Sequence, residues 1–150
     1  MSTPADTKTS GGEPSRAGAA AALRARGYRV TPQRIAIQET LVELGRHVSA
    51  EELLGAARRR NSGLSLPTVY AALDALEDAG LVRRIATGRG PALYDPEPAD
   101  HHHLVCRHCG SVEDLEATVA TSGALDAATG SGFHPEGAEL VVHGLCERCG

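Results

Sequence analysis

The chain has 150 residues and a formal net charge of −4, a length that suits one domain of ordinary size or two small ones. No apolar run approaches the roughly 20 residues that a membrane-spanning helix needs, which argues against a membrane protein. The charge is unevenly distributed, because residues 1–94 carry 13 basic against 9 acidic residues and residues 95–150 carry 2 against 10. Such a division predicts a nucleic-acid surface on the basic half and cation ligands on the acidic half, although chance clustering of surface charge would give the same counts.

The N-terminal segment, residues 1–15, is small, polar and rich in Pro, Gly and Ser. It has too few apolar residues for a packed structure, so we predict a disordered tail. The segment also lacks the apolar centre of a secretory signal, and we therefore expect a cytoplasmic protein.

Two helices are predicted from the residues that begin them. Thr31 is a good N-cap, and Pro32 fits the first helical position because its missing N–H is not needed there. Ser49 and Glu52 have the spacing of a capping box at the start of a second helix, which we expect to end near Arg60. Apolar side chains in a largely helical pattern follow the first start at Ile35, Ile37, Leu41 and Leu44.

A third helix is predicted to begin near Ser65 and to end at Gly80, a residue typical of helix C-termini. Its buried stripe begins at Val69 and continues at helical spacing. Thr68 and Tyr70 lie near its start and off that stripe, where a partner can reach them.

After the third helix the pattern changes to that of strands. The segments VRRIA and PALYD flank TGRG, which indicates a β-hairpin with Gly88 and Gly90 in its turn. Helices followed by a basic two-stranded hairpin are typical of a winged helix-turn-helix, whose third helix enters the DNA major groove by its N-terminal end. The alternative is a helical domain with solvated arginines. The candidate DNA-binding residues are Arg34, Ser65, Thr68, Tyr70, Arg83, Arg84 and Arg89, of which the arginines would contact phosphates and give affinity without sequence information.

The cysteines form two Cys-x-x-Cys pairs separated by 36 residues, and each pair can chelate one ion from a tight turn. Four thiolates in tetrahedral geometry select zinc in a closed, structural site. The alternatives are two disulfides, which a reducing cytoplasm disfavours, or four unrelated thiols. The predicted structural zinc ligands are Cys106, Cys109, Cys146 and Cys149.

A histidine cluster precedes the first cysteine pair, in a segment that we expect to end as a strand. Because alternate strand residues share a face, His101 and His103 point to the same side. Asp95 precedes them, Asp114 follows on the expected adjacent strand, and His47 lies in the basic half before the second capped helix. Imidazoles and carboxylates together suit iron(II) or manganese(II), and would also bind zinc, nickel or copper. The alternative is a solvated histidine tract.

Five segments together resemble the ferric uptake regulator family of metal-dependent transcriptional regulators, in the family's order. They are GYRVTPQR, RHVSAEEL, LSLPTVYAALDALEDAGLV, HHHLVCRHCG and GLCERCG, within residues 27–150. The resemblance implies an α+β homodimer, with an N-terminal winged helix-turn-helix domain that binds operator DNA and a C-terminal α/β dimerisation domain. It also implies a structural Zn(2+) on the two cysteine pairs. We accordingly expect a DNA-binding domain at residues 16–94 and a metal-binding dimerisation domain at residues 95–150.

Among the subgroups of this family, the chain looks most like the peroxide-sensing repressors. One departure from the family pattern is Ala71, where an arginine often follows the recognition-helix tyrosine. The function implied is that of a repressor released when iron catalyses the oxidation of a ligand histidine, rather than that of an enzyme. The regulatory ligands implied by this resemblance are His47, Asp95, His101, His103 and Asp114, with Fe(2+) or Mn(2+) as the ion.

Two other functions stay open at this point. An iron- or other metal-responsive repressor would have the same site without peroxide chemistry. A metal-independent zinc-ribbon adaptor or a metalloenzyme belongs to a different class, which the wing and the division of charge argue against.

Overall fold

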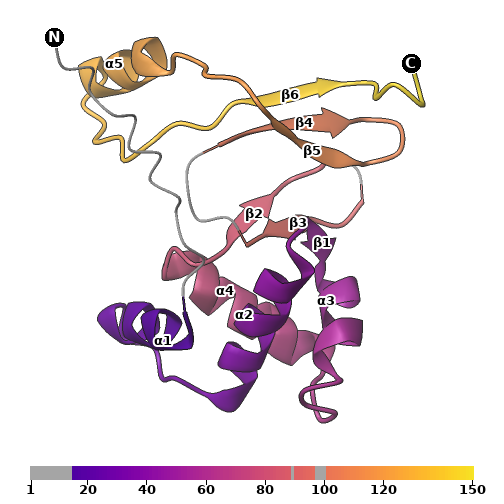
Figure 1. Ribbon diagram of the computed structural model, residues 1–150. Coiled ribbons are helices and arrows are strands. Elements are labelled where there is room, and N and C mark those ends of the chain that lie inside the picture. The colour runs from indigo at the N-terminus through magenta and orange to yellow at the C-terminus, as the bar shows by residue number, and fades with distance from the viewer. Residues whose placement is uncertain (1–14, 89, 97–100) are drawn as a thin grey trace, which may run out of the picture.

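The computed structural model describes residues 15–88, 90–96 and 101–150, and it has the α+β architecture that the sequence predicts (Figure 1). The first unit contains α1 (Arg16–Ala25), α2 (Pro32–Leu44), α3 (Ala50–Ala57), α4 (Leu66–Asp78) and a small sheet of β1 (Val48–Ser49), β2 (Arg83–Ile85) and β3 (Leu93–Asp95). The second unit contains β4 (His102–Cys106), β5 (Val112–Leu115), α5 (Ser122–Gly130) and β6 (Val141–Gly144). The small sheet lies between the helices and the second sheet. The predicted disordered tail, except for its last residue, lies outside the described residues.

Both capped helix starts predicted from the sequence are confirmed. The Thr31 hydroxyl accepts a hydrogen bond from the backbone N–H three residues on, at 3.3 Å. Ser49 and Glu52 make both hydrogen bonds of a capping box at the start of α3. The end of α3 differs from the prediction, because the chain after Ala57 tightens into a turn instead of continuing as a helix to Arg60.

Two elements of the first unit were not predicted from the sequence. α1 is an alanine-rich helix capped by Ser15, whose hydroxyl accepts a hydrogen bond from the Gly18 N–H at 3.2 Å. β1 is only two residues long and pairs with β3, so that Val48 lies opposite Tyr94. The wing therefore has three strands in the order β1-β3-β2, and β2 and β3 form the predicted antiparallel hairpin.

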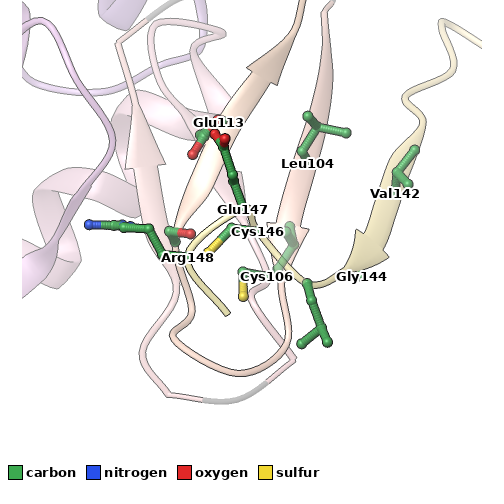
Figure 2. A pocket seen from close by; sticks show the side chains of 11 residues that line it. Leu104, Cys106, Glu113, Val142, Gly144, Cys146, Glu147 and Arg148 are labelled. Atoms are coloured by element: carbon green, nitrogen blue, oxygen red, sulfur yellow. The ribbon is translucent and has the colours of Figure 1, made fainter. Parts of the chain in front are cut away.

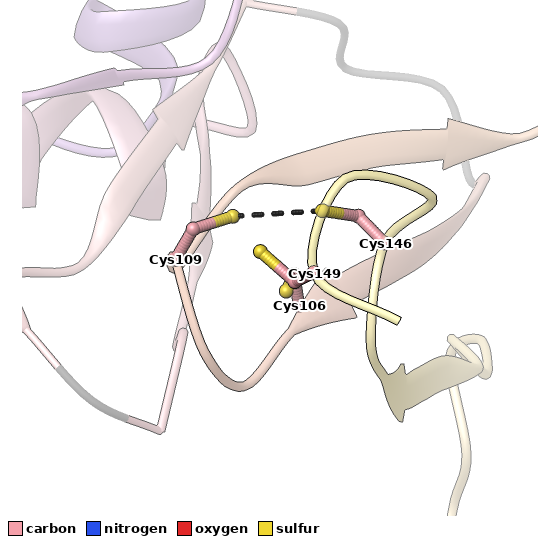
Figure 3. A group of neighbouring side chains, drawn as sticks. All are labelled: Cys106, Cys109, Cys146 and Cys149. Atoms are coloured by element: carbon pink, nitrogen blue, oxygen red, sulfur yellow. Dashed lines mark hydrogen bonds between the residues drawn. The ribbon is translucent and has the colours of Figure 1, made fainter.

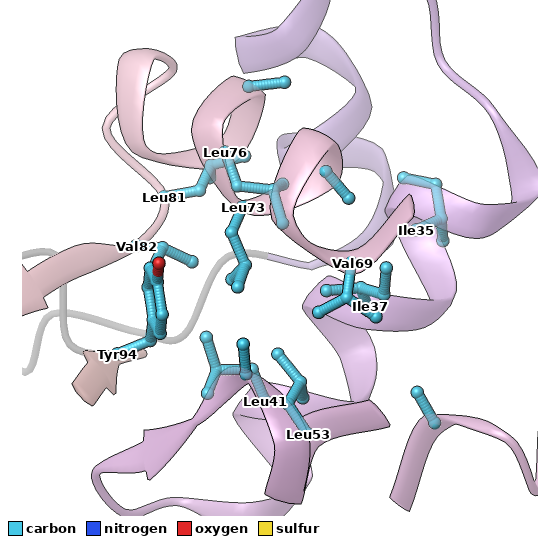
Figure 4. Close-up of a cluster of buried hydrophobic side chains, with 14 of the residues drawn as sticks. Ile35, Ile37, Leu41, Leu53, Val69, Leu73, Leu76, Leu81, Val82 and Tyr94 are labelled. Carbon is cyan, nitrogen blue, oxygen red and sulfur yellow. The ribbon is translucent and has the colours of Figure 1, made fainter. Parts of the chain in front are cut away.

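The first unit is built around an apolar core between α2, α3 and α4 (Figure 4). Leu41, Leu53 and Leu73 come from these three helices and are each 0% exposed. Tyr94 of β3 belongs to the same cluster and fixes the wing to the helices. Because full burial of a leucine stabilises a fold by about 1.5–3 kcal/mol, this core holds α4 and the wing in a fixed relation.

The second unit is a sheet in the order β5-β4-β6, with β4 antiparallel to β5 and parallel to β6. A parallel pair needs a long connection, and α5 lies in that connection, apart from the strands (Figure 1). Among the described residues, none after Tyr94 belongs to the apolar core cluster, and α5 has no buried residue. No helix in the described part of the chain is long and apolar enough to cross a membrane.

Candidate metal centres

The four cysteines lie together at one end of the second sheet (Figure 3). Cys106 ends β4 and Cys109 lies in the turn that leads to β5, while Cys146 and Cys149 follow β6. The parallel pairing of β4 with β6 brings these two turns side by side, since Cys106 is the register partner of Gly144. All four sulfur atoms lie within 4.8 Å of one another.

The spacing of these sulfur atoms matches a tetrahedral metal site. The Cys109 and Cys146 sulfurs are 3.8 Å apart, and four tetrahedral bonds of about 2.3 Å place neighbouring sulfurs roughly 3.8 Å from one another. The sulfurs of a disulfide would be only about 2.0 Å apart, and all four cysteines are free. The cluster therefore fits a zinc ion better than two disulfides.

Hydrogen bonds shift the pKa values of three of these thiols, those of Cys106, Cys146 and Cys149, in different directions. Backbone N–H groups, first that of Cys109, lower the pKa of the Cys106 thiol to about 5. A side-chain hydrogen bond with Cys149 lowers the pKa of Cys146, and the same bond raises the pKa of Cys149 to about 12. One thiolate thus opposes ionisation of its neighbour, and a cation is needed to stabilise four thiolates at this distance.

The second cluster consists of three imidazoles and two carboxylates, which the structure brings together from both units. Asp95 Oδ2 lies 2.9 Å from His47 Nε2, 2.7 Å from His101 Nε2 and 3.2 Å from His103 Nε2. Asp114 Oδ1 lies 3.2, 3.2 and 3.6 Å from the same three nitrogens. Donor atoms bound at about 2.1 Å and at right angles are roughly 3.0 Å apart, so these five atoms are spaced as the neighbours of a single ion.

Strand pairing places each side chain of this cluster. β1 pairs with β3, which brings His47, the residue before β1, beside Asp95 at the end of β3. β4 presents His103, and its antiparallel partner β5 places Asp114 directly opposite. His101 precedes β4 and turns to the same side as His103, with ring centroids 4.4 Å apart.

Two of the imidazoles have their outer nitrogens fixed by acceptors. His47 Nδ1 lies 3.2 Å from the Val112 carbonyl oxygen, and His103 Nδ1 lies 2.7 Å from Glu139 Oε1. A proton on each Nδ1 leaves the Nε2 lone pair directed into the cluster, which is the tautomer that a metal ion requires. The hydrogen bond with Asp95 is the main cause that raises the pKa of His47. A positive charge is thus favoured here, whether a proton or a metal ion carries it.

Three of the predicted DNA contacts lie around the N-terminal end of α4. Ser65 caps the helix, and its hydroxyl lies 2.9 Å from that of Thr68. Tyr70 is 39% exposed on the same part of the helix. On the wing, Arg84 is exposed on β2.

Two other predicted DNA contacts make bonds within the protein. Arg34 Nη1 donates to the Arg29 carbonyl oxygen at 2.6 Å. Arg83 of β2 pairs with Glu139 of the second unit, with Nη1 and Oε2 3.3 Å apart. The remaining predicted contact, Arg89, lies outside the described residues.

Glu139 and the Val112 carbonyl were missed by sequence reasoning. Glu139 is 36 residues from His103 along the chain, and the parallel pairing of β4 with β6 brings them together. The one signal available was an acidic residue immediately before the apolar run Leu140–Val142, and it did not indicate which side chain it would meet.

A groove lies at the cysteine end of the second sheet, lined by apolar side chains, by Cys106 and Cys146, and by the charged residues Glu113, Glu147 and Arg148 (Figure 2). It has a volume of about 450 Å³. Leu104 and Val142 face each other across β4 and β6 and are 36% and 42% exposed, and Leu145 beyond them is 49% exposed. Adjacent exposed apolar side chains of this kind are typical of a protein–protein interface.

Residues 25–150 match the ferric uptake regulator family. The transcriptional regulator FurA of Mycobacterium tuberculosis is 38% identical over 128 residues, which cover 85% of this chain and 86% of that protein. The peroxide operon regulator of Bacillus subtilis is 32% identical over 127 residues, which cover 85% of this chain and 88% of that protein. The structure of the ferric uptake regulator from Pseudomonas aeruginosa with manganese is similar with a TM-score of 0.69, at 29% identity over 85% of this chain and 96% of that one.

Proposed function

The chain belongs to the ferric uptake regulator family, whose members are transcriptional regulators rather than enzymes, and we propose that it is a metal-dependent repressor that senses hydrogen peroxide. That it is a metal-responsive transcriptional regulator follows from the family; the peroxide response is the proposal. The observation that carries it is the convergence of three imidazoles and two carboxylates on one point between the two units.

The cysteine quartet is proposed to hold a structural Zn(2+). The donor set is all sulfur, the two pairs follow the neighbouring ends of the parallel strands β4 and β6, and the 3.8 Å sulfur separation supports tetrahedral binding. Such a site is closed to substrates, so its role is to stabilise the second unit.

The imidazole–carboxylate cluster is proposed to hold the regulatory ion, Fe(2+) or Mn(2+), on His47, Asp95, His101, His103 and Asp114. Mixed nitrogen and oxygen donors suit these ions. His47 precedes β1 of the first unit, while His103 and Asp114 belong to the second sheet, so an occupied site ties the winged helix to the rest of the chain. By linkage, an ion that binds the DNA-competent arrangement more tightly also raises the affinity for DNA. To change the ratio of DNA-competent to incompetent molecules from 1:99 to 99:1, the ion must bind the competent arrangement about 5.5 kcal/mol more tightly.

Iron(II) at this site would supply the redox chemistry by which hydrogen peroxide oxidises a neighbouring imidazole. One peroxide oxygen is inserted at a ring C–H and the other leaves as water. His47 and His101 are the expected targets by family resemblance, and their side chains are 13% and 19% exposed whereas that of His103 is 0% exposed. An oxidised ring would be a poorer ligand than an imidazole, and without His47 or His101 as a ligand the site would no longer tie the winged helix to the second sheet.

The N-terminal end of α4 is proposed to enter the major groove of operator DNA. Ser65, Thr68 and Tyr70 lie at that end, and the arginines at 34, 83, 84 and 89 are the proposed phosphate contacts. A regulator of this kind acts where the chromosome is, so we also propose a cytoplasmic location.

A second copy of the chain is the proposed occupant of this groove on the second sheet. Regulators of this family bind DNA as dimers, and the groove combines exposed Leu104, Val142 and Leu145 on adjacent strands. A two-fold interface on the second unit would place two winged helices at the spacing of two operator half-sites.

The test is peptide mass spectrometry after brief peroxide exposure of iron-loaded and manganese-loaded protein, with binding to duplex DNA followed in parallel. We expect one added oxygen on the His47 or His101 peptide, with iron only, together with loss of DNA binding. The exposed histidines His108 and His143 are internal controls and are expected to stay unmodified.

Unmodified cluster histidines and retained DNA binding in the iron-loaded protein would contradict peroxide sensing. They would support the second candidate function, a metal-responsive repressor without peroxide chemistry. The likeness to the ferric uptake regulator of Pseudomonas aeruginosa favours that alternative.

A further inference from the structure

Glu139 lies between a candidate metal ligand and the wing. Its Oε1 atom is 2.7 Å from His103 Nδ1, and its Oε2 atom is 3.3 Å from Arg83 Nη1. Glu139 lies two residues before β6, whereas Arg83 begins β2. The carboxylate therefore joins the second unit to the first at a point separate from His47.

We propose that Glu139 is a positioning residue that orients His103 for metal binding and, through Arg83, ties the occupied site to the wing. The proposal rests on the regulatory metal site proposed above. It adds a residue that is not among the ligands of that site.

The burial of His103 makes its outer hydrogen bond important. The side chain is 0% exposed, so bulk water does not reach its Nδ1 atom while the Glu139 carboxylate is in place. A carboxylate that accepts the Nδ1–H fixes the tautomer and the plane of the ring, and it makes Nε2 a stronger donor to a metal ion. In metal sites generally, removing such a partner lowers metal affinity or activity by about 10- to 100-fold.

The ion pair with Arg83 holds the carboxylate in its orientation. The side chains of Arg83 and Glu139 are 20% and 28% exposed, so solvent screens this pair less than a pair that projects into water. Arg83 is also the register partner of Asp95, itself a candidate ligand, in the β2–β3 hairpin. A wing movement that breaks the ion pair would release the carboxylate that orients His103, and a bound ion would oppose that movement.

The test is the affinity of the zinc-loaded, full-length protein for Mn(II), titrated while electron paramagnetic resonance detects the free ion. Glu139→Ala is expected to weaken Mn(II) binding by about 10- to 100-fold. Glu139→Gln keeps an oxygen that accepts the Nδ1–H and is expected to recover part of the loss. Glu136→Ala removes an exposed glutamate of the same segment and is the matched control, with unchanged affinity expected.

Arg83→Gln tests the connection to the wing. It is expected to weaken Mn(II) binding in the wild-type background and to have no further effect in the Glu139→Ala background, because the arginine acts through the carboxylate. Additive effects of the two substitutions would overturn this part of the proposal.

The absorption spectrum of Co(II) at the same site separates positioning of His103 from general loss of structure. Glu139→Ala is expected to shift the bands at saturating Co(II), since the donor strength of His103 changes, while bound zinc and far-ultraviolet circular dichroism stay as in the wild type.

Three results would overturn the proposal. Equal Mn(II) affinity and equal Co(II) spectra for the wild type and Glu139→Ala would remove the role of Glu139 and leave the metal site in place. Zinc loss from both Glu139 variants would assign the residue a structural role instead. Failure of the wild-type protein to bind Mn(II) would overturn the regulatory site together with this inference.

Discussion

The two units of the molecule are stabilised by different means. The first buries a continuous apolar cluster between Ala19 and Tyr94, to which no described residue of the second unit belongs. The second gathers four cysteines and most of the imidazole–carboxylate cluster instead. Apolar burial needs no ion, whereas a ligand cluster depends on the ion it binds. We therefore expect the first unit to keep its fold without a metal ion, and the fold of the second unit to depend on the ions that it is proposed to bind.

Removal of zinc is expected to have the largest effect and to leave the first unit folded. Zinc contributes about 10–16 kcal/mol to small zinc-dependent domains, so chelation or Cys109→Ser should unfold the β4–β6 sheet. Hydrogen exchange of peptides from β4, β6 and α2 measures this, with rapid exchange expected only in the two strands. If the β4 amides stay protected from hydrogen exchange after complete loss of zinc, the second unit does not depend on zinc for its fold.

A cavity in the apolar core is expected to destabilise the first unit and to leave the second unit unchanged. Leu73→Ala removes a side chain that is 0% exposed and should lower the free energy of unfolding of the first unit by about 2–5 kcal/mol. Urea unfolding followed by circular dichroism gives this value, and the zinc content should not change. Tyr70→Ala, on the exposed side of the same helix, is the control; an equal loss there would show that α4 is not held by this core.

His47→Ala should remove the link that the imidazole–carboxylate cluster makes between the two units, without unfolding either unit. The imidazole contacts Asp95 and the Val112 carbonyl, and its removal is expected to weaken Mn(II) binding by at least about tenfold, or roughly 1.4 kcal/mol. Zinc content and the urea midpoint of the first unit should match the wild type. The bridging role fails if Mn(II) still raises DNA affinity as much as in the unsubstituted protein.

Among these predictions, the smallest change in the free energy of unfolding is expected when the capping box of α3 is broken. The Ser49 N–H lowers the pKa of Glu52 below its ordinary value of 4.5. A carboxyl with a lower pKa in the folded state adds stability above its unfolded pKa, and this contribution is lost as the pH falls through the folded pKa. Glu52→Gln should cost less than about 1 kcal/mol at pH 7, because the side chain is 49% exposed.

The same substitution should flatten the fall in unfolding free energy as the pH is lowered below the ordinary glutamate pKa of 4.5. Urea unfolding at several pH values measures this slope. Glu51→Gln, which removes an exposed acid of the same turn but neither hydrogen bond of the capping box, is the matched control. Identical slopes for the wild type and Glu52→Gln would show that the capping box contributes nothing to the pH dependence.

The features of the fold that the sequence predicts correctly are those that depend on residues close together in the chain. The starts at Thr31 and Ser49 are confirmed because a cap involves residues three positions apart. The two-residue strand β1 exists only through its pairing with β3, which no nearby residue indicates. α1 was missed because Leu23 is its one large apolar side chain and its other apolar residues are alanines, which have high helix propensity but bury little surface.

In the candidate sites too, contacts between near neighbours in the sequence could be predicted and contacts made by distant strand pairing could not. Alternation along a strand correctly places His101 and His103 on one side, toward Asp95. The contact of His103 with Glu139 depends on the distant pairing of β4 with β6, so spacing along the chain could not predict it. That the two clusters bind metal ions stays a prediction.

The parallel pairing of β4 with β6 also fixes an order of events in folding. The helices of the first unit form from near neighbours, but β6 reaches β4 only by closing a long loop, which is entropically costly and slow. The Cys106–Cys109 turn forms locally and can capture an ion before the second cysteine pair arrives. If the four cysteines hold zinc as proposed, we expect chains made without zinc to have a folded first unit and an open second sheet.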